Sequence, residues 1–212
     1  MTEKAQRAGS PLAWVPSLYV AMGIPFSLVI WVAGTMFKNL GISDTQIALA
    51  TGSVGIAWSL KPFWASFLDM YRTKKFWVLS MELVIAVLLG LMAAALPLPN
   101  YFQVIIGILW IMAFASSTQD ICADGVYITA LDKPAQARWI GWQGAAWNTG
   151  RIFATALVVY IAGKLQESGH SPKSSWAIAL CFSAAVMGGF AIYHFYKLPT
   201  GTVIRRPENT AE

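Results

Sequence analysis

Charged residues are scarce in this sequence. Asp, Glu, Lys and Arg together make up 12% of its 212 residues, against about 25% in an ordinary soluble domain. Hydrophobic residues make up 57%, which is more apolar surface than a globule of this size can hide. This balance excludes an ordinary soluble domain and predicts a polytopic membrane protein.

Cysteine and histidine are also scarce, with two of each. Cys122 and Cys181 fall inside apolar stretches, and neither has a histidine nearby in the sequence. We therefore expect no disulfide framework, no metal site and no cofactor. His170 lies in a predicted loop and His194 near the end of the last apolar stretch. No nucleophile, base and orienting group are expected to converge, so the sequence does not favour an enzyme.

Six apolar stretches are long enough to span a bilayer as helices of about 20 residues. They cover approximately residues 15–36, 45–67, 76–96, 102–130, 140–161 and 174–196. The sequence therefore predicts an all-α membrane bundle at 14–198, preceded by a cytoplasmic tail at 1–13. Residues 199–212 are expected to be a second cytoplasmic tail or the start of a linker. No cleavable signal peptide is expected, because the first stretch is too long for one.

The basic residues are distributed unevenly among the predicted connections. With the N-terminus inside, the inner connections carry ten Lys and Arg and the outer ones only Lys38, Lys164 and Lys173. Basic residues gather on the cytoplasmic side of membrane proteins, so both termini are expected in the cytoplasm. The net charge of +5 then follows from topology, and no nucleic-acid partner is expected.

Five charged residues lie inside the predicted spans: Lys61, Glu82, Asp120, Asp124 and Arg151. Such charges are costly and normally face a partner, the bundle interior or a water-filled path. A rise of about 1.5 Å per residue puts most of them in the inner half of the membrane, with Arg151 near the midplane. Two interpretations stay open: a structural ion-pair network, or a polar cavity that binds substrate or carries protons.

Asp120 is the main candidate for proton coupling. Asp124 follows it by four residues and therefore lies on the same helix face. A basic partner for Asp120 is expected from Lys61 or Arg151. Asp124 has a second interpretation, in which it pairs at the membrane interface with an inner basic residue.

Amides and basic side chains near the same depth are the candidate substrate-binding residues: Lys61, Gln119, Gln143, Asn148 and Arg151. Asn148 and Arg151 lie three residues apart and so share a helix face. Amides and a guanidinium suit sugar hydroxyls and carboxylates better than they suit a purely apolar compound.

An acidic residue followed by a basic turn closes the second predicted span, with Asp69 followed by Arg72, Lys74 and Lys75. This turn resembles the inner loop between helices two and three of major facilitator transporters, where such charges form a conformational lock. Met70 and Arg72 stand where that loop usually has other residues, including an Arg directly after the acid.

Two segments together resemble the muropeptide permease (AmpG) family of that superfamily. They are residues 61–69, with the sequence KPFWASFLD, and residues 117–124, with the sequence STQDICAD. An Arg in the fifth helix of the family matches Arg151. Ala65 and the triplet at 123–125 depart modestly from some members.

The resemblance implies the N-terminal half of a major-facilitator bundle with a 3+3 helix repeat. It also implies proton-driven symport of muropeptides, built from N-acetylglucosamine and anhydro-N-acetylmuramic acid, across the bacterial inner membrane during peptidoglycan recycling. Such transporters have at least twelve helices, so the chain is expected either to be one half of a longer protein or to pair with a second chain. Two alternatives stay open: a related transporter of another substrate, such as a siderophore, and a non-transporting membrane scaffold or assembly subunit.

Overall fold

The computed structural model describes residues 10–201, and every regular element in this range is a helix. The first segment joins α1 (Pro11–Ser27), the π-helix η1 (Leu28–Val32) and α2 (Ala33–Asn39). A second segment is divided into α3 (Asp44–Gly52), α4 (Ile56–Ser59) and α5 (Lys61–Met70). After α6 (Lys74–Ala95) and α7 (Tyr101–Ala130), a long segment joins α8 (Lys133–Ile152), the π-helix η2 (Phe153–Val158) and α9 (Val159–Glu167), and α10 (Pro172–Lys197) follows.

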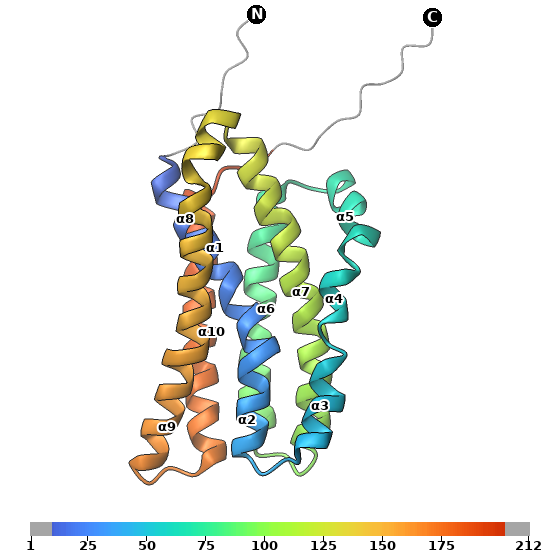
Figure 1. Cartoon of the computed structure of the whole chain (residues 1–212), viewed down its shortest axis with the longest axis vertical. Coiled ribbons are helices and arrows are strands. Elements are labelled where there is room, and N and C mark those ends of the chain that lie inside the picture. The colour runs from blue at the N-terminus through green and yellow to red at the C-terminus, as the bar shows by residue number, and fades with distance from the viewer. Residues whose placement is uncertain (1–9, 202–212) are drawn as a thin grey trace, which may run out of the picture.

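Successive segments run in opposite directions along the long axis of the bundle (Figure 1). The beginning of α1, the end of α10 and the connections after α5 and α7 all lie at one end. The connections that were predicted to lie on the cytoplasmic side thus share one end of the molecule. α1 begins at Pro11, slightly before the expected boundary. The predicted tails at 1–13 and 199–212 fall mostly outside the described residues.

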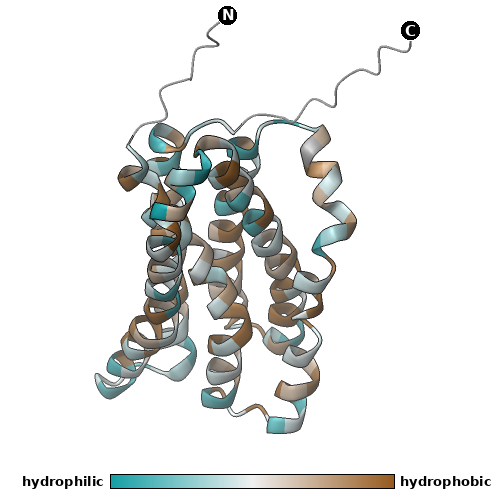
Figure 2. Cartoon of the chain, turned by 45° about the horizontal axis from the view of Figure 1, so that its top comes forward, coloured by the Kyte–Doolittle hydropathy of each residue, from teal (hydrophilic) through white to brown (hydrophobic). Residues whose placement is uncertain are grey.

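Within the described residues, four segments are long and apolar enough to cross a membrane: Pro11–Asn39, Lys74–Ala95, Tyr101–Ala130 and Pro172–Lys197. Figure 2 shows the hydrophilic colouring gathered toward the two ends of the bundle, with hydrophobic colouring along the helices between them. The chain is an all-α, membrane-embedded protein. The expected spans at 45–67 and 140–161 are not among these four.

The stretch 45–67 is divided because its sequence interrupts a helix twice. Gly52 and Gly55 flank the turn between α3 and α4, and glycine costs about 1 kcal/mol relative to alanine inside a helix. Pro62 lies at the beginning of α5, and it has no N–H to continue the hydrogen bonding from α4. The stretch 140–161 does lie in one continuous helical segment, but Gln143, Asn148 and Arg151 make it less apolar than the other four.

The core is formed where α6 packs extensively against α7 and α10, and α1 packs against α8. The crossing of α1 and α8 has backbone against backbone at Gly23 and Gly150. A Cβ atom at Gly23 would overlap the carbonyl oxygen of Trp147, and one at Gly150 would overlap that of Val20. Small residues permit this close approach in membrane helices.

The helices α3 and α4 contribute few side chains to the core. α3 contributes no buried side chain, and α4 buries only Ala57. In Figure 1 these helices lie along one side of α7. Because their apolar contact with the core is small, the polar contacts that join them to α7 account for a large part of their attachment.

Candidate functional site

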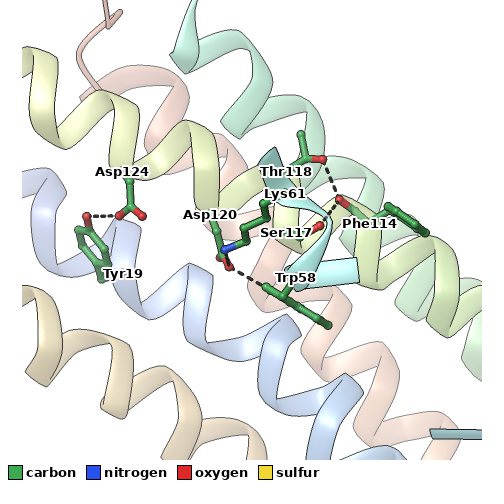
Figure 3. A network of polar contacts seen from close by, with 8 residues as sticks. All are labelled: Tyr19, Trp58, Lys61, Phe114, Ser117, Thr118, Asp120 and Asp124. Carbon is green, nitrogen blue, oxygen red and sulfur yellow. Dashed lines mark hydrogen bonds and ion pairs between the residues drawn. The ribbon is translucent and has the colours of Figure 1, made fainter. Parts of the chain in front are cut away.

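Asp120 in α7 is the centre of a polar site between α7 and the α4–α5 segment. Its Oδ2 atom accepts hydrogen bonds from Lys61 Nζ at 2.9 Å and from Trp58 Nε1 at 3.0 Å. Figure 3 shows both side chains directed at Asp120. The expected contact between Lys61 and Asp120 is confirmed, and Lys61 rather than Arg151 is the basic partner.

The two donors lie three residues apart, on either side of the junction between α4 and α5. Trp58 lies in α4, Leu60 ends that helix, and Lys61 begins α5. Asp120 is buried, whereas Lys61 retains partial exposure. The second carboxylate oxygen, Asp120 Oδ1, is buried and has no hydrogen-bond partner among the described residues. The site therefore contains an acceptor that no donor in the described part of the chain uses.

Asp124 lies one turn further along α7 and contacts α1. Its Oδ1 atom accepts a hydrogen bond from the Tyr19 hydroxyl at 2.8 Å (Figure 3). The Gln143 side chain from α8 also interacts with the Tyr19 hydroxyl. The hydrogen-bond donor to Asp124 is thus a tyrosine within the bundle, and not the inner basic residue that one interpretation of the sequence proposed.

Gln119 points away from Asp120 and takes part in a second buried group. Its Nε2 atom donates to Glu82 Oε1 in α6 at 3.4 Å, and the same oxygen contacts His194 Nδ1 in α10 at 2.7 Å. His194 Nε2 contacts the Ser17 hydroxyl in α1 at 3.0 Å. This group joins four helices, and neither His194 nor Ser17 was recognised from the sequence as part of it.

Ser17, His194 and Glu82 thus form a continuous series of hydroxyl, imidazole and carboxyl contacts. The prediction that no nucleophile, base and orienting group converge is therefore wrong as a statement of geometry. Acyl transfer would also need N–H donors aimed at the developing oxyanion. The amide groups around Ser17 lie inside α1 and take part in that helix's own hydrogen bonds. The arrangement suits proton transfer better than acyl transfer.

The hydroxyls of Ser117 and Thr118, which precede Asp120 in α7, have a structural role. Ser117 and Thr118 both donate to the carbonyl oxygen of Phe114, at 3.1 and 2.8 Å (Figure 3). Hydrogen bonds of this kind to the preceding turn are common for Ser and Thr within helices. The acidic residues and Gln119, rather than these hydroxyls, make the contacts between helices.

Arg151 is separate from the acidic residues. No carboxylate in residues 10–201 forms an ion pair with it, and its Nε atom is buried without a hydrogen-bond partner. Its guanidinium lies 5.9 Å from the centre of the Trp31 ring. The idea that Arg151 shares one ion-pair network with Asp120 is therefore not supported by these contacts.

An aromatic cluster connects Arg151 to the Asp120 site. Phe26 in α1 lies between three indole rings, with centroids 5.4 Å from Trp31, 5.0 Å from Trp58 and 5.5 Å from Trp147. Trp58 is the residue that donates to Asp120, and Trp31 is the ring beneath Arg151. A carboxylate and a guanidinium thus lie at the two ends of this aromatic cluster.

Asn148 and the predicted lock residues make contacts separate from the Asp120 site. Asn148 is exposed on α8 and donates to the Gly144 carbonyl oxygen at 2.9 Å. Of the predicted lock residues, Lys75 Nζ donates to the Phe195 carbonyl oxygen in α10 at 2.7 Å, and Arg72 lies over the Phe76 ring. Lys74 is buried against α7 beside Gly125. The side chain of Asp69 lies outside the described part of the structure.

No model of a known protein family matches this chain. Within residues 10–201, no group of three or more His, Cys, Asp and Glu side chains is arranged to hold a metal ion. The chemistry of the candidate site therefore has to be inferred from its own carboxylates, bases and aromatic rings.

Proposed function

We propose that this chain is the N-terminal half of a proton-coupled secondary transporter in the bacterial inner membrane. In this proposal it belongs to the muropeptide permease family, has both termini in the cytoplasm and imports muropeptides by alternating access. A C-terminal six-helix half, on the same or a second chain, completes the transporter. The resemblance of residues 61–69 and 117–124 to that family supports the choice of substrate.

The ion pair between Lys61 and Asp120 is the observation that carries the proposal. It joins the segment α3–α5, in which α3 and α4 bury few side chains, to α7, one of the central helices. Protonation of Asp120 would remove its negative charge and with it most of the attraction to Lys61. Because few apolar contacts hold α3 and α4 in place, a single proton on Asp120 would loosen this whole segment from α7.

Substrate recognition is assigned to the aromatic cluster and Arg151. A guanidinium can hold a carboxylate through two parallel hydrogen bonds, and a muropeptide carries carboxylates on its peptide. The indole rings of Trp31, Trp58 and Trp147 offer flat apolar surfaces for the sugar rings. Since Trp58 also donates to Asp120, a bound sugar that displaces this indole would change the hydrogen bonding of the proposed proton carrier.

Uptake of radiolabelled muropeptide into membrane vesicles tests this function. The vesicles contain the chain together with its C-terminal half, and a proton gradient is imposed across the membrane. Accumulation that depends on both the protein and the gradient is the expected result. Membrane insertion without uptake above empty vesicles would instead favour a scaffold. Gradient-driven uptake of a different solute, such as a siderophore, would show that the substrate assignment is wrong and would support the proton-coupled mechanism.

A further inference from the structure

Glu82 and His194 form a pair that is completely enclosed by the bundle. Both side chains have no exposed surface, and Glu82 Oε1 lies 2.7 Å from His194 Nδ1. They join α6 to α10, two helices in extensive contact. The pair is separated from the Asp120 site by α7, since Gln119 and Asp120 are consecutive residues whose side chains contact different helices.

Two buried oxygens beside this pair have no donor. Glu82 Oε2 and Gln119 Oε1 are both without a hydrogen-bond partner among the described residues, although the two side chains touch through Gln119 Nε2 and Glu82 Oε1. A buried acceptor without a partner costs about 1–3 kcal/mol. This cost is larger for a charged group, so a proton on Glu82, which makes it a neutral acid, lowers it.

The other titratable groups on the surrounding helices are engaged or distant. On α7, Asp120 is paired with Lys61 and Asp124 accepts from Tyr19 of α1. On α10, Tyr193 donates to the Ala13 carbonyl oxygen and Lys197 is exposed. On α6, Lys74 precedes Glu82 by two helical turns, about 12 Å along the axis. The pair therefore depends on its own protons for charge balance.

Ser17 gives the pair a connection to the surface. Its hydroxyl contacts His194 Nε2 at 3.0 Å and can also donate to the Trp14 carbonyl oxygen at 3.1 Å. Ser17 lines a groove of about 330 Å³ between α1 and α10, together with Val186, Gly189, Phe190 and Tyr193. A hydroxyl with two alternative acceptors can accept one proton and release another.

We propose that Glu82 and His194 form a proton-binding site distinct from Asp120, which exchanges one proton through the Ser17 hydroxyl. With the proton bound, Glu82 is a neutral acid whose hydroxyl donates to His194 Nδ1, and the neutral imidazole donates from Nε2 to the Ser17 oxygen. On release, the Glu82 proton moves to Nδ1, the Nε2 proton moves to the Ser17 oxygen, and the serine's own proton leaves to water in the groove. Glu82 is then a carboxylate that accepts from Nδ1–H, and the neutral imidazole accepts from the Ser17 hydroxyl at Nε2. This site does not depend on the transport function proposed above.

Infrared spectroscopy of the full chain in lipid bilayers tests the bound proton. A carboxyl C=O band that persists at neutral pH, where exposed carboxyls are ionised, is expected in the wild type and lost as the pH is raised. The band should disappear in Glu82→Gln and remain in Asp120→Asn. Nitrogen-15 NMR should show His194 as the neutral Nε2–H tautomer where the band is present and as the neutral Nδ1–H tautomer once the band is lost, and His170→Gln assigns the two histidine signals. A charged His194 with no carboxyl band at neutral pH would show a permanent ion pair and overturn the proposal.

The route of exchange is tested by the rate at which that band responds to a pH jump. Ser17→Ala is expected to slow the response by at least about tenfold, because positioned groups accelerate proton transfer by 10²–10⁴. Ser183→Ala is the matched control, since Ser183 is a buried serine of α10 that bonds only the Ala179 carbonyl oxygen. Equal rates in the two variants would exclude Ser17 as the route. The wild-type spectrum alone still decides whether the proton is bound.

Discussion

Lys61 and Asp120 meet at 2.9 Å with unequal exposure, since about 30% of the Lys61 side chain but only 10% of the Asp120 side chain is exposed. A lysine in this position can turn its ammonium toward water when its partner is lost, because its long apolar stem is flexible. The aspartate has no such freedom. The two halves of this ion pair should therefore respond differently to mutation.

We predict that Lys61→Met destabilises the chain more than Asp120→Asn. Removing Lys61 leaves a buried carboxylate with Trp58 as its remaining donor, and breaking a buried pair in this way costs about 3–5 kcal/mol. Asp120→Asn should cost about 1–3 kcal/mol. Unfolding in detergent measures both. Lys38→Met and Asp44→Asn are the controls, because that pair is largely exposed and should contribute at most about 1 kcal/mol. Equal losses at Lys61 and Asp120 would contradict the asymmetry.

Apart from its effect on stability, Asp120 should be required for proton-coupled transport. Asp120→Asn retains the size of the side chain but has no titratable carboxyl, so gradient-driven accumulation should be lost in the assembled transporter. Exchange of labelled for unlabelled substrate, which needs no gradient, should continue. Asp44→Asn is the matched control and should accumulate normally. Full accumulation by Asp120→Asn, corrected for protein level, would remove Asp120 from the coupling mechanism.

The pairing of the buried charges was only partly predictable from the sequence. Either Lys61 or Arg151 was expected to meet Asp120 because charges in apolar helices require partners, and the structure selects Lys61. The contact between Glu82 and His194 was not expected. Helices such as α6 and α7 are apolar over much of their circumference, so periodicity does not reveal which face packs against which neighbour. The one feature of the sequence that pointed to this contact was a histidine, His194, inside the last apolar stretch.

The interruption of the second expected span had a clearer signal. Gly52, Gly55 and Pro62 stand within or beside the helix-breaking turns of that stretch, and each weakens a continuous helix. The hydrophobicity of this stretch predicted one continuous span, because hydrophobicity does not depend on whether the backbone is interrupted. The two donors to the Asp120 carboxylate lie on either side of one of these interruptions, with Trp58 in α4 and Lys61 at the beginning of α5.

Tyr19→Phe should destabilise the contact between α1 and α7. The substitution removes the hydroxyl that donates to Asp124 at 2.8 Å and leaves a part-buried carboxylate with one donor fewer. Hydrogen bonds to charged groups contribute about 1.5–3 kcal/mol, so we expect a loss in that range. A double-mutant cycle with Asp124→Asn measures the coupling. Additive effects of the two substitutions would show that this hydrogen bond contributes nothing to stability.

Gly150→Ala should disrupt the crossing of α1 and α8. A methyl group there overlaps the Val20 carbonyl oxygen, and because that atom is backbone, one helix must move. Overpacking of this kind costs about 1–3 kcal/mol or more. Gly144→Ala, six residues earlier on α8, is the control because nothing lies within 4 Å of the added atom. It should stabilise the helix by about 0.5–1 kcal/mol. Thermal unfolding in detergent compares the two, and similar midpoints would refute the close contact.

Arg151→Lys should weaken binding of muropeptide while leaving the fold intact. Arg151 has no carboxylate partner among residues 10–201 and lies over the Trp31 ring, so no ion pair is broken by the change. Lysine retains the charge but not the planar fork that holds a carboxylate through two parallel hydrogen bonds. The loss of such geometry corresponds to about 1–3 kcal/mol, or approximately 5- to 150-fold in the dissociation constant.

A binding titration on the assembled transporter measures this effect with two ligands. The first is the intact muropeptide, and the second is the same disaccharide without its peptide carboxylates. Arg151→Lys should weaken the first and have little effect on the second, because only the first presents an anion to the guanidinium. Arg138→Lys, an exposed position on the same helix, should affect neither. If Arg151→Lys instead binds both ligands as tightly as the wild type but unfolds at a lower temperature, Arg151 stabilises the helices through Trp31 and does not bind substrate.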